Sequence, residues 1–350
     1  MKKFSEFIIE NMEYSQNSIK EQKIYEDILR EDSNILLEEL RRSLLIWSSF
    51  GISSRMYLFE SSKYHFEHLD DIVNDIFKWI NEQDIPEKQN KMFDFSKYDV
   101  FFKKLILKIR LANKLEGGHE KENLESDTVS FELSLIKNKP IDEYSLYETK
   151  RLNYLIIHEL CHIYENKIMI DDGNPNGIFY DIDSKEYKKY WRAVDYLISG
   201  RNIPKIKEEL VLCGYFLDDR EKFAYIGTIK QTIKNIFSKI KPTYEDLKFE
   251  EILELFSEEF IWDKYVKIDV FIKSLNENKD KDLQYKIWRI YNGLYDEEIP
   301  EEEILEELKN KWKYFKKEFM EEFLISYDEC VNTMKLEKFI DMDFSDKIYE

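Results

Sequence analysis

The chain has 350 residues, of which 43% are hydrophobic and 36% are charged, and its formal net charge is −19. This composition excludes an intrinsically disordered protein, because the apolar fraction is sufficient for a substantial core. The acidic excess repels nucleic-acid phosphates and anionic lipid surfaces, so we expect neither nucleic acid nor a membrane as a partner. The 3 cysteines are far apart in the sequence and indicate no disulfide framework.

The amino-acid sequence shows no signal peptide and no membrane-spanning segment. The N-terminus begins with two lysines, but Glu6 and Glu10 interrupt any apolar segment of the kind that a signal peptide needs. No apolar run reaches the roughly 20 residues of a membrane-spanning helix. We therefore expect a cytoplasmic protein. Heavy use of Lys, Ile, Asn, Glu and Tyr is typical of AT-rich genes, which suggests a low-GC bacterium or its phage as the source.

Helical periodicity dominates the first part of the chain. Residues 33–48 and 66–83 each place their apolar side chains on one stripe, which predicts two amphipathic helices. Residues 56–60 predict a short strand. Pro86 and the polar stretch that runs to about residue 95 predict the end of a helical N-terminal region, 1–95.

Two later segments change to a period of two. In 104–112 and in 128–136, apolar residues alternate with polar ones, which predicts two half-buried strands. The charged connection between them contains Gly117 and Gly118, so we expect an antiparallel hairpin with a long loop. A helix is expected to follow at about 142–168.

Helices are expected for most of the remaining chain, at 184–199, at 219–239 and throughout 244–340. An aromatic stripe after Pro300 predicts a core seam or a surface for a protein partner: Leu308, Trp312, Phe315, Phe319, Phe323 and Tyr327. The predicted fold class is α+β and mostly helical. We expect three regions: helical 1–95, a core at 96–241, and helical 242–350.

The segment YLIIHELCHIYENK, residues 154–167, places three polar side chains in an apolar helix. His158 and His162 are four residues apart, which puts both imidazoles on one helix face, where they can ligate one divalent ion. Glu159 lies further round the helix and can serve as a general base. With 5 histidines in 350 residues, this H-E-x-x-H pattern is expected by chance on the order of 0.01 times per chain.

A catalytic zinc site needs a third protein ligand. No histidine follows His162, which excludes every pattern that has a third histidine downstream. A downstream carboxylate is therefore expected, and Glu221 is the first candidate because it opens a predicted helix. Asp181 and Asp195 remain alternatives. Tyr225, one turn after Glu221, would point the same way and could donate a hydrogen bond to an oxyanion.

The segments HELCH and DDREKFAY resemble the zincin metallopeptidases, and among them the gluzincin-like branch, in which a downstream glutamate completes the site. Glu221 and Ala224 match the E-x-x-A pattern of small phage and bacterial domains of this kind. The resemblance covers about 100–240 and implies a zincin-like core, in which a small antiparallel sheet packs on the active-site helix. It also implies that the strand at 128–136 is an edge strand that pairs with extended substrate.

The function expected from these residues is that of a zinc-dependent metallopeptidase acting on a protein or peptide substrate. Zn²⁺ would be held by His158, His162 and Glu221, with Glu159 as the general base and Tyr225 as an oxyanion donor. The alternative is a non-catalytic zincin-fold protein, such as a phage accessory protein. In that case, the C-terminal helices would hold a protein partner.

Overall fold

The computed structural model describes residues 27–47, 66, 68–83, 85, 88–98, 100, 102–119, 127–171, 219–240, 249–277 and 300–345. The predicted strand at 56–60 and the predicted helix at 184–199 lie outside these residues. Within them, no helix is both long enough and apolar enough to cross a membrane. The predicted fold class, α+β and mostly helical, is confirmed.

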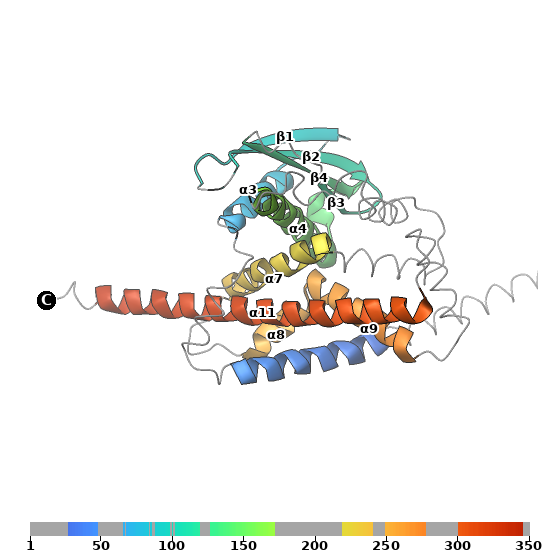
Figure 1. The fold of residues 1–350 in the computed structure, drawn as a ribbon. Helices are drawn as coiled ribbons and strands as arrows, with labels where there is room; N and C mark the ends of the chain where they lie inside the picture. The colour runs from blue at the N-terminus through green and yellow to red at the C-terminus, as the bar shows by residue number, and fades with distance from the viewer. Residues whose placement is uncertain are drawn as a thin grey trace, which may run out of the picture.

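The elements are stacked in layers (Figure 1). A sheet lies at the top of the view, with α3 (Leu69–Asn81) and α4 (Leu146–Asp171) beneath it. Helix α7 (Asp219–Ile240) follows, and the 45-residue helix α11 (Glu301–Ser345) crosses below it. The blue helix of residues 27–47 closes the stack.

Within the described residues, the sheet has four strands in the order β1-β2-β4-β3. Its strands are β1 (Lys88–Asp94), β2 (Lys104–Ala112), β3 (Glu116–His119) and β4 (Thr128–Ile136). The outer pairs β1–β2 and β3–β4 are antiparallel, but the central pair β2–β4 is parallel, with Leu107 beside Phe131. The predicted antiparallel hairpin of the two strands is therefore wrong, and the sheet is mixed.

Two further sequence predictions are wrong because of strand β3. Gly117 and Gly118 were expected in the long loop of a hairpin, but they lie in β3, which pairs antiparallel with β4. Strand β4 was expected at the edge, but it lies between β2 and β3, so β3 is the edge strand on that side among the residues that the structure describes. Strand β1 also falls in a stretch that was expected to be a polar boundary. The sequence pattern does not predict β1 as a strand because only one of its side chains, Phe93, is buried.

One face of the sheet forms a core with α3 and α4. The alternating apolar residues of β2 and β4 are almost fully buried there, so the period-two prediction of half-buried strands is confirmed. The other face is polar, and Arg110 Nε lies 2.7 Å from Glu132 Oε1 on it. This sheet core includes Leu105, Leu107, Ile109, Val129, Phe131, Leu133, Ile72, Ile76, Ile156 and Leu160.

A second core joins the helix of residues 27–47 to α7, α8 (Phe249–Ser257), α9 (Phe260–Glu277) and α11. The aromatic stripe of α11 lies inside it, with Phe315, Phe319 and Phe323 fully buried. The interpretation of this stripe as a core seam is therefore confirmed. A protein partner for the C-terminal helices stays a prediction.

Packing crosses the predicted region boundaries. The helix of residues 27–47 packs with the C-terminal helices, and β1 belongs to the sheet. Helix α4 contributes to both cores, with Tyr154 in the helical core and Ile156 in the sheet core. The division into 1–95, 96–241 and 242–350 stays a prediction.

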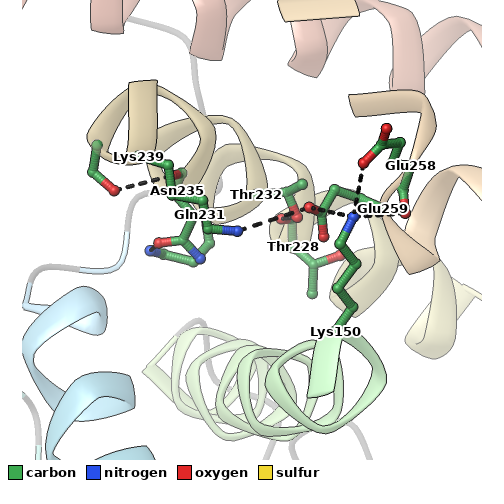
Figure 2. Close-up of polar contacts among 9 residues, drawn as sticks. Lys150, Thr228, Gln231, Thr232, Asn235, Lys239, Glu258 and Glu259 are labelled. Atoms are coloured by element: carbon green, nitrogen blue, oxygen red, sulfur yellow. Dashed lines mark hydrogen bonds and ion pairs between the residues drawn. The ribbon is translucent and has the colours of Figure 1, made fainter. Parts of the chain in front are cut away.

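Polar contacts fix the first half of α4 against the C-terminal helices (Figure 2). Lys150 Nζ donates to the carbonyl oxygen of Glu258 at 3.1 Å and lies 3.4 Å from Glu259 Oε1. Lys239 of α7 approaches the same carboxylate atom of Glu259 at 3.9 Å. Helices α4 and α7 therefore share an anchor at the turn between α8 and α9.

Helix α4 begins with a reciprocal cap. The Glu148 carboxylate accepts the backbone N–H of Ser145 at 2.7 Å, and the Ser145 hydroxyl oxygen accepts the Glu148 N–H at 3.2 Å. This arrangement satisfies two backbone donors at the helix start. Lys139 Nζ donates to the same carboxylate at 2.6 and 2.7 Å. Hydrogen bonds from Lys139 and Ser145 lower the pKa of Glu148 to about 2.

We expect the contribution of Glu148 to the free energy of unfolding to be lost at low pH. Because its folded-state pKa lies below the ordinary value of 4.5, its contribution is fully present above pH 4.5 and is lost as the pH falls towards about 2. Urea unfolding of the wild type and Glu148→Gln should therefore show a gap in midpoint at pH 7 that narrows below pH 4.5. A gap that is independent of pH would contradict the ionic role of this carboxylate.

Candidate metal centre

Helix α4 directs its two histidines towards α7. Ile156, Ile157 and Leu160 are buried in the sheet core, which leaves the face that carries His158 and His162 turned towards α7. The two imidazole rings lie one turn apart, with centroids 4.6 Å from each other. The apolar residues of this segment thus fix the helix, and the histidines face a neighbouring helix.

Glu221 supplies a carboxylate from the first turn of α7. Its Oε2 lies 3.1 Å from His158 Nε2, and its Oε1 lies 3.6 Å from His162 Nε2. Ligand atoms of the three residues all lie within 4.8 Å of one another, and all three side chains are buried. Ala224 is fully buried in the sheet core, consistent with the close approach of α7 to α4. The structure therefore brings together the three predicted ligands, whereas Asp181 and Asp195 lie outside the described residues.

The outer ring nitrogens of both histidines face further polar side chains. His158 Nδ1 lies 3.4 Å from the hydroxyl oxygen of Tyr154, and His162 Nδ1 lies 3.8 Å from Glu165 Oε2. The Tyr154 hydroxyl lies within hydrogen-bonding distance of His158, and histidines that bind metals usually donate the N–H of the outer nitrogen to such a partner, which fixes the ring. The sequence reasoning missed both partners. Their signal was spacing, because Tyr154 is four residues before His158 and Glu165 is three after His162.

Glu159 lies on the side of α4 that faces β3. It is only 5% exposed, and its carboxylate lies against Gly117. Burial raises the pKa of Glu159 to about 8, with His162 lowering it and Glu221 raising it further. A carboxyl group with a pKa near neutrality is suited to taking and returning a proton.

Tyr225 stands beside the histidines, as its position one turn after Glu221 predicts. Its ring centroid lies 4.9 Å from that of His158 and 5.8 Å from that of Tyr154. Burial raises the pKa of Tyr225 far above its usual range, so the phenol keeps its proton. Thr228, which Figure 2 shows on α7, donates its hydroxyl to the carbonyl oxygen of Tyr225 at 2.7 Å.

The charges of the three clustered residues are interdependent. Burial would raise the pKa of Glu221, but His162 and the hydrogen bonds from both histidines outweigh it and hold that pKa below its usual range. Burial lowers the pKa of His158. For His162, the attraction of Glu221 and Glu165 overcomes burial and raises the pKa. The carboxylate thus stands ionised between the two imidazoles.

The donor chemistry of this group fits a divalent metal ion. Two imidazole nitrogens and one carboxylate are a common ligand set of catalytic zinc sites, which keep a further position open. To bind an ion, each Nε2 would have to give up the proton that it shares with Glu221, and the Tyr154 hydroxyl lies close enough to His158 Nδ1 to accept the N–H of that tautomer. His158, His162 and Glu221 could therefore hold a metal ion without a change in the fold.

Comparison of the chain with protein-family models, curated proteins and solved structures finds no match.

Proposed function

We propose that this protein is a zinc-dependent metallopeptidase that hydrolyses a peptide bond. The observation that carries the proposal is the buried group of His158, His162 and Glu221, assembled from two helices. The H-E-x-x-H spacing on α4 and the position of Glu159 between this group and the sheet edge support it. The proposal extends the resemblance to gluzincin-like peptidases from a sequence pattern to an arrangement of side chains.

The residues divide the chemistry among them. His158, His162 and Glu221 would hold the ion, which would supply Lewis acidity towards water and a carbonyl group. Glu159 takes the proton of the attacking water and returns it to the leaving amine. Tyr225, whose phenol keeps its proton, donates a hydrogen bond to the developing oxyanion. Tyr154 is placed to hold the His158 ring by a hydrogen bond, and the Glu165 carboxylate, 3.8 Å from His162 Nδ1, offers the His162 ring a negative charge.

An extended peptide is the substrate that this arrangement favours. Strand β3 is the last strand on its side of the sheet among the described residues, so its outer edge can accept another strand. Gly117 of that strand is exposed, and the carboxylate of Glu159 lies directly beside it. Backbone pairing along β3 would bring a peptide bond close to the general base. The pairing strand of the proposal is therefore β3 instead of the strand at 128–136.

Zinc content is the first test. We expect about one zinc ion per purified wild-type chain and a loss of zinc from Glu221→Ala and His158→Ala, because each variant removes one of three ligands. Glu165→Gln should bind zinc about 10- to 100-fold more weakly, because it keeps the ligands but alters the partner of His162. Metal analysis and competition with a chromogenic chelator measure both effects.

Glu159→Gln is the control in this series. It alters a buried carboxylate next to His158 but removes none of the three clustered ligands, so its zinc content should equal that of the wild type. Equal zinc content in Glu221→Ala would contradict the ligand set. A chain that holds zinc but cleaves no peptide from an unfolded-protein or peptide mixture would instead favour the non-catalytic alternative.

A further inference from the structure

Two neighbouring glycines of β3 have different surroundings. A Cβ atom placed on Gly117 would lie 2.3 Å from Oε1 of Glu159 and 3.0 Å from its Cδ and Cγ. A Cβ placed on Gly118 would meet nothing within 4 Å. The difference follows from strand geometry, because consecutive residues direct their side chains to opposite faces of a sheet. Gly117 faces α4 and Gly118 faces away.

Backbone conformation does not explain why residue 117 is a glycine. Its φ angle lies outside the left-handed region that favours glycine, so an alanine could adopt the same backbone. Glycine is required at this position because there is no room for a Cβ atom. The closest of the three contacts is shorter than real Cβ contacts ever are, and because Cγ is crowded as well, turning the carboxylate alone does not relieve the overlap.

Neither backbone can easily retreat from this contact. Strand β3 is paired with β4, where Gly117 stands beside Leu133. Arg151 of α4 donates from Nη2 to the carbonyl oxygen of Leu115 at 2.8 Å, which fixes the start of β3 against the helix. Ile156 and Leu160 bury α4 in the sheet core. A side chain at position 117 would therefore displace Glu159.

We infer that Gly117 is a positioning residue for Glu159: the space left by its missing side chain is where the carboxylate lies. The edge strand thereby sets the place of the carboxylate relative to the group of His158, His162 and Glu221. The catalytic meaning of this contact rests on the proposed function, but the contact itself does not.

The first experiment therefore uses metal-free protein and no substrate. Thermal unfolding is measured for Gly117→Ala and Gly118→Ala, each in the wild-type and in the Glu159→Ala background. Both alanines remove the same backbone freedom from the unfolded chain, so their difference isolates the contact. We expect Gly117→Ala to melt about 3 °C or more below Gly118→Ala. In the Glu159→Ala background this gap should close, because Cγ, Cδ and Oε1 are gone.

The four melting temperatures of this double-mutant cycle either support the positioning role of Gly117 or contradict it. Equal melting temperatures in the wild-type background, or a gap of the same size in both backgrounds, would overturn it. If Gly117→Ala does not fold, folding of Gly117→Ala with Glu159→Ala supports the inference. Failure of both would show that the strand itself needs glycine, which overturns it.

A second experiment addresses the catalytic consequence in the zinc-loaded protein. Gly117→Ala should keep its zinc and its KM for a peptide but lose about 100-fold in kcat, as expected for a displaced catalytic group. Gly118→Ala should also keep its zinc, because a Cβ atom at that position meets nothing within 4 Å. Full kcat in Gly117→Ala would overturn the positioning role. If the wild type shows no peptidase activity, the proposed function fails, while the unfolding cycle still tests the contact.

Discussion

Glu159→Gln is expected to reduce the rate of peptide hydrolysis by about 10²- to 10⁴-fold, the usual contribution of a general base. Glutamine has the shape of the native side chain but cannot accept the proton of water. Because the group of His158, His162 and Glu221 does not include this residue, the variant should bind zinc as the wild type does. Steady-state kinetics on a fluorogenic peptide, together with metal analysis of the same samples, measures both quantities.

The comparison variant for this experiment is Glu165→Gln, a second buried glutamate on the same helix. Its expected effect is on zinc affinity, so saturating zinc should restore most of its rate. Zinc should restore nothing in Glu159→Gln. A Glu159→Gln protein with the wild-type rate would eliminate this residue as the general base.

Phe319→Ala is expected to lower the free energy of unfolding by about 3–5 kcal/mol, the range for removal of a buried phenylalanine. Phe319 is fully buried on α11, and its ring stacks on Tyr265 of α9 with centroids 4.1 Å apart. Trp262 and Phe256 also surround it, at ring distances of 6.4 and 6.1 Å. Truncation leaves a cavity that these large rings cannot collapse to fill. Urea unfolding measures the change.

Tyr314→Ala on the same helix is the matched control. Tyr314 is 66% exposed, so we expect its replacement to change the free energy of unfolding by at most about 0.5 kcal/mol. Both variants lose an aromatic ring from one helix, and they differ mainly in burial. Similar losses in the two variants would contradict the assignment of the α11 stripe to the core.

Periodicity predicted the elements of the fold better than their connections. The alternation in 104–112 and 128–136 identified both strands and their buried faces. The alternation carries no information on strand direction, and the antiparallel expectation rested on assigning Gly117 and Gly118 to the long loop of a hairpin. In the structure, β3 pairs on the far side of β4, so β2 and β4 are neighbours in parallel. Only tertiary pairing decides this.

Strand β1 could not be found from an apolar pattern. Its residues, KQNKMFD, form an edge strand of which a single side chain is buried. Edge strands are commonly polar and rich in lysine, which protects their unpaired backbone from other chains. The same polarity makes such a segment resemble a loop in the sequence. Pairing with β2 gives it the strand conformation.

The residues of the candidate site also differ in how far the sequence could predict them. His158, Glu159 and His162 were found because their relation is local to one helix turn. Glu221 was found by elimination, since no later histidine exists, and the structure places it between the two imidazoles. The contact of Gly117 with Glu159 joins a strand to a helix, so no sequence spacing could have indicated it.

Helix α4, which contributes to both cores, has a consequence for cooperativity. The ligands on α4 lie where the sheet core and the helical core meet, and Glu221 joins them from α7. Neither core can open without disturbing the geometry of the site. Binding of an ion by this group would therefore be thermodynamically linked to the folding of both cores, so that the ion would stabilise the sheet and the distant helices alike.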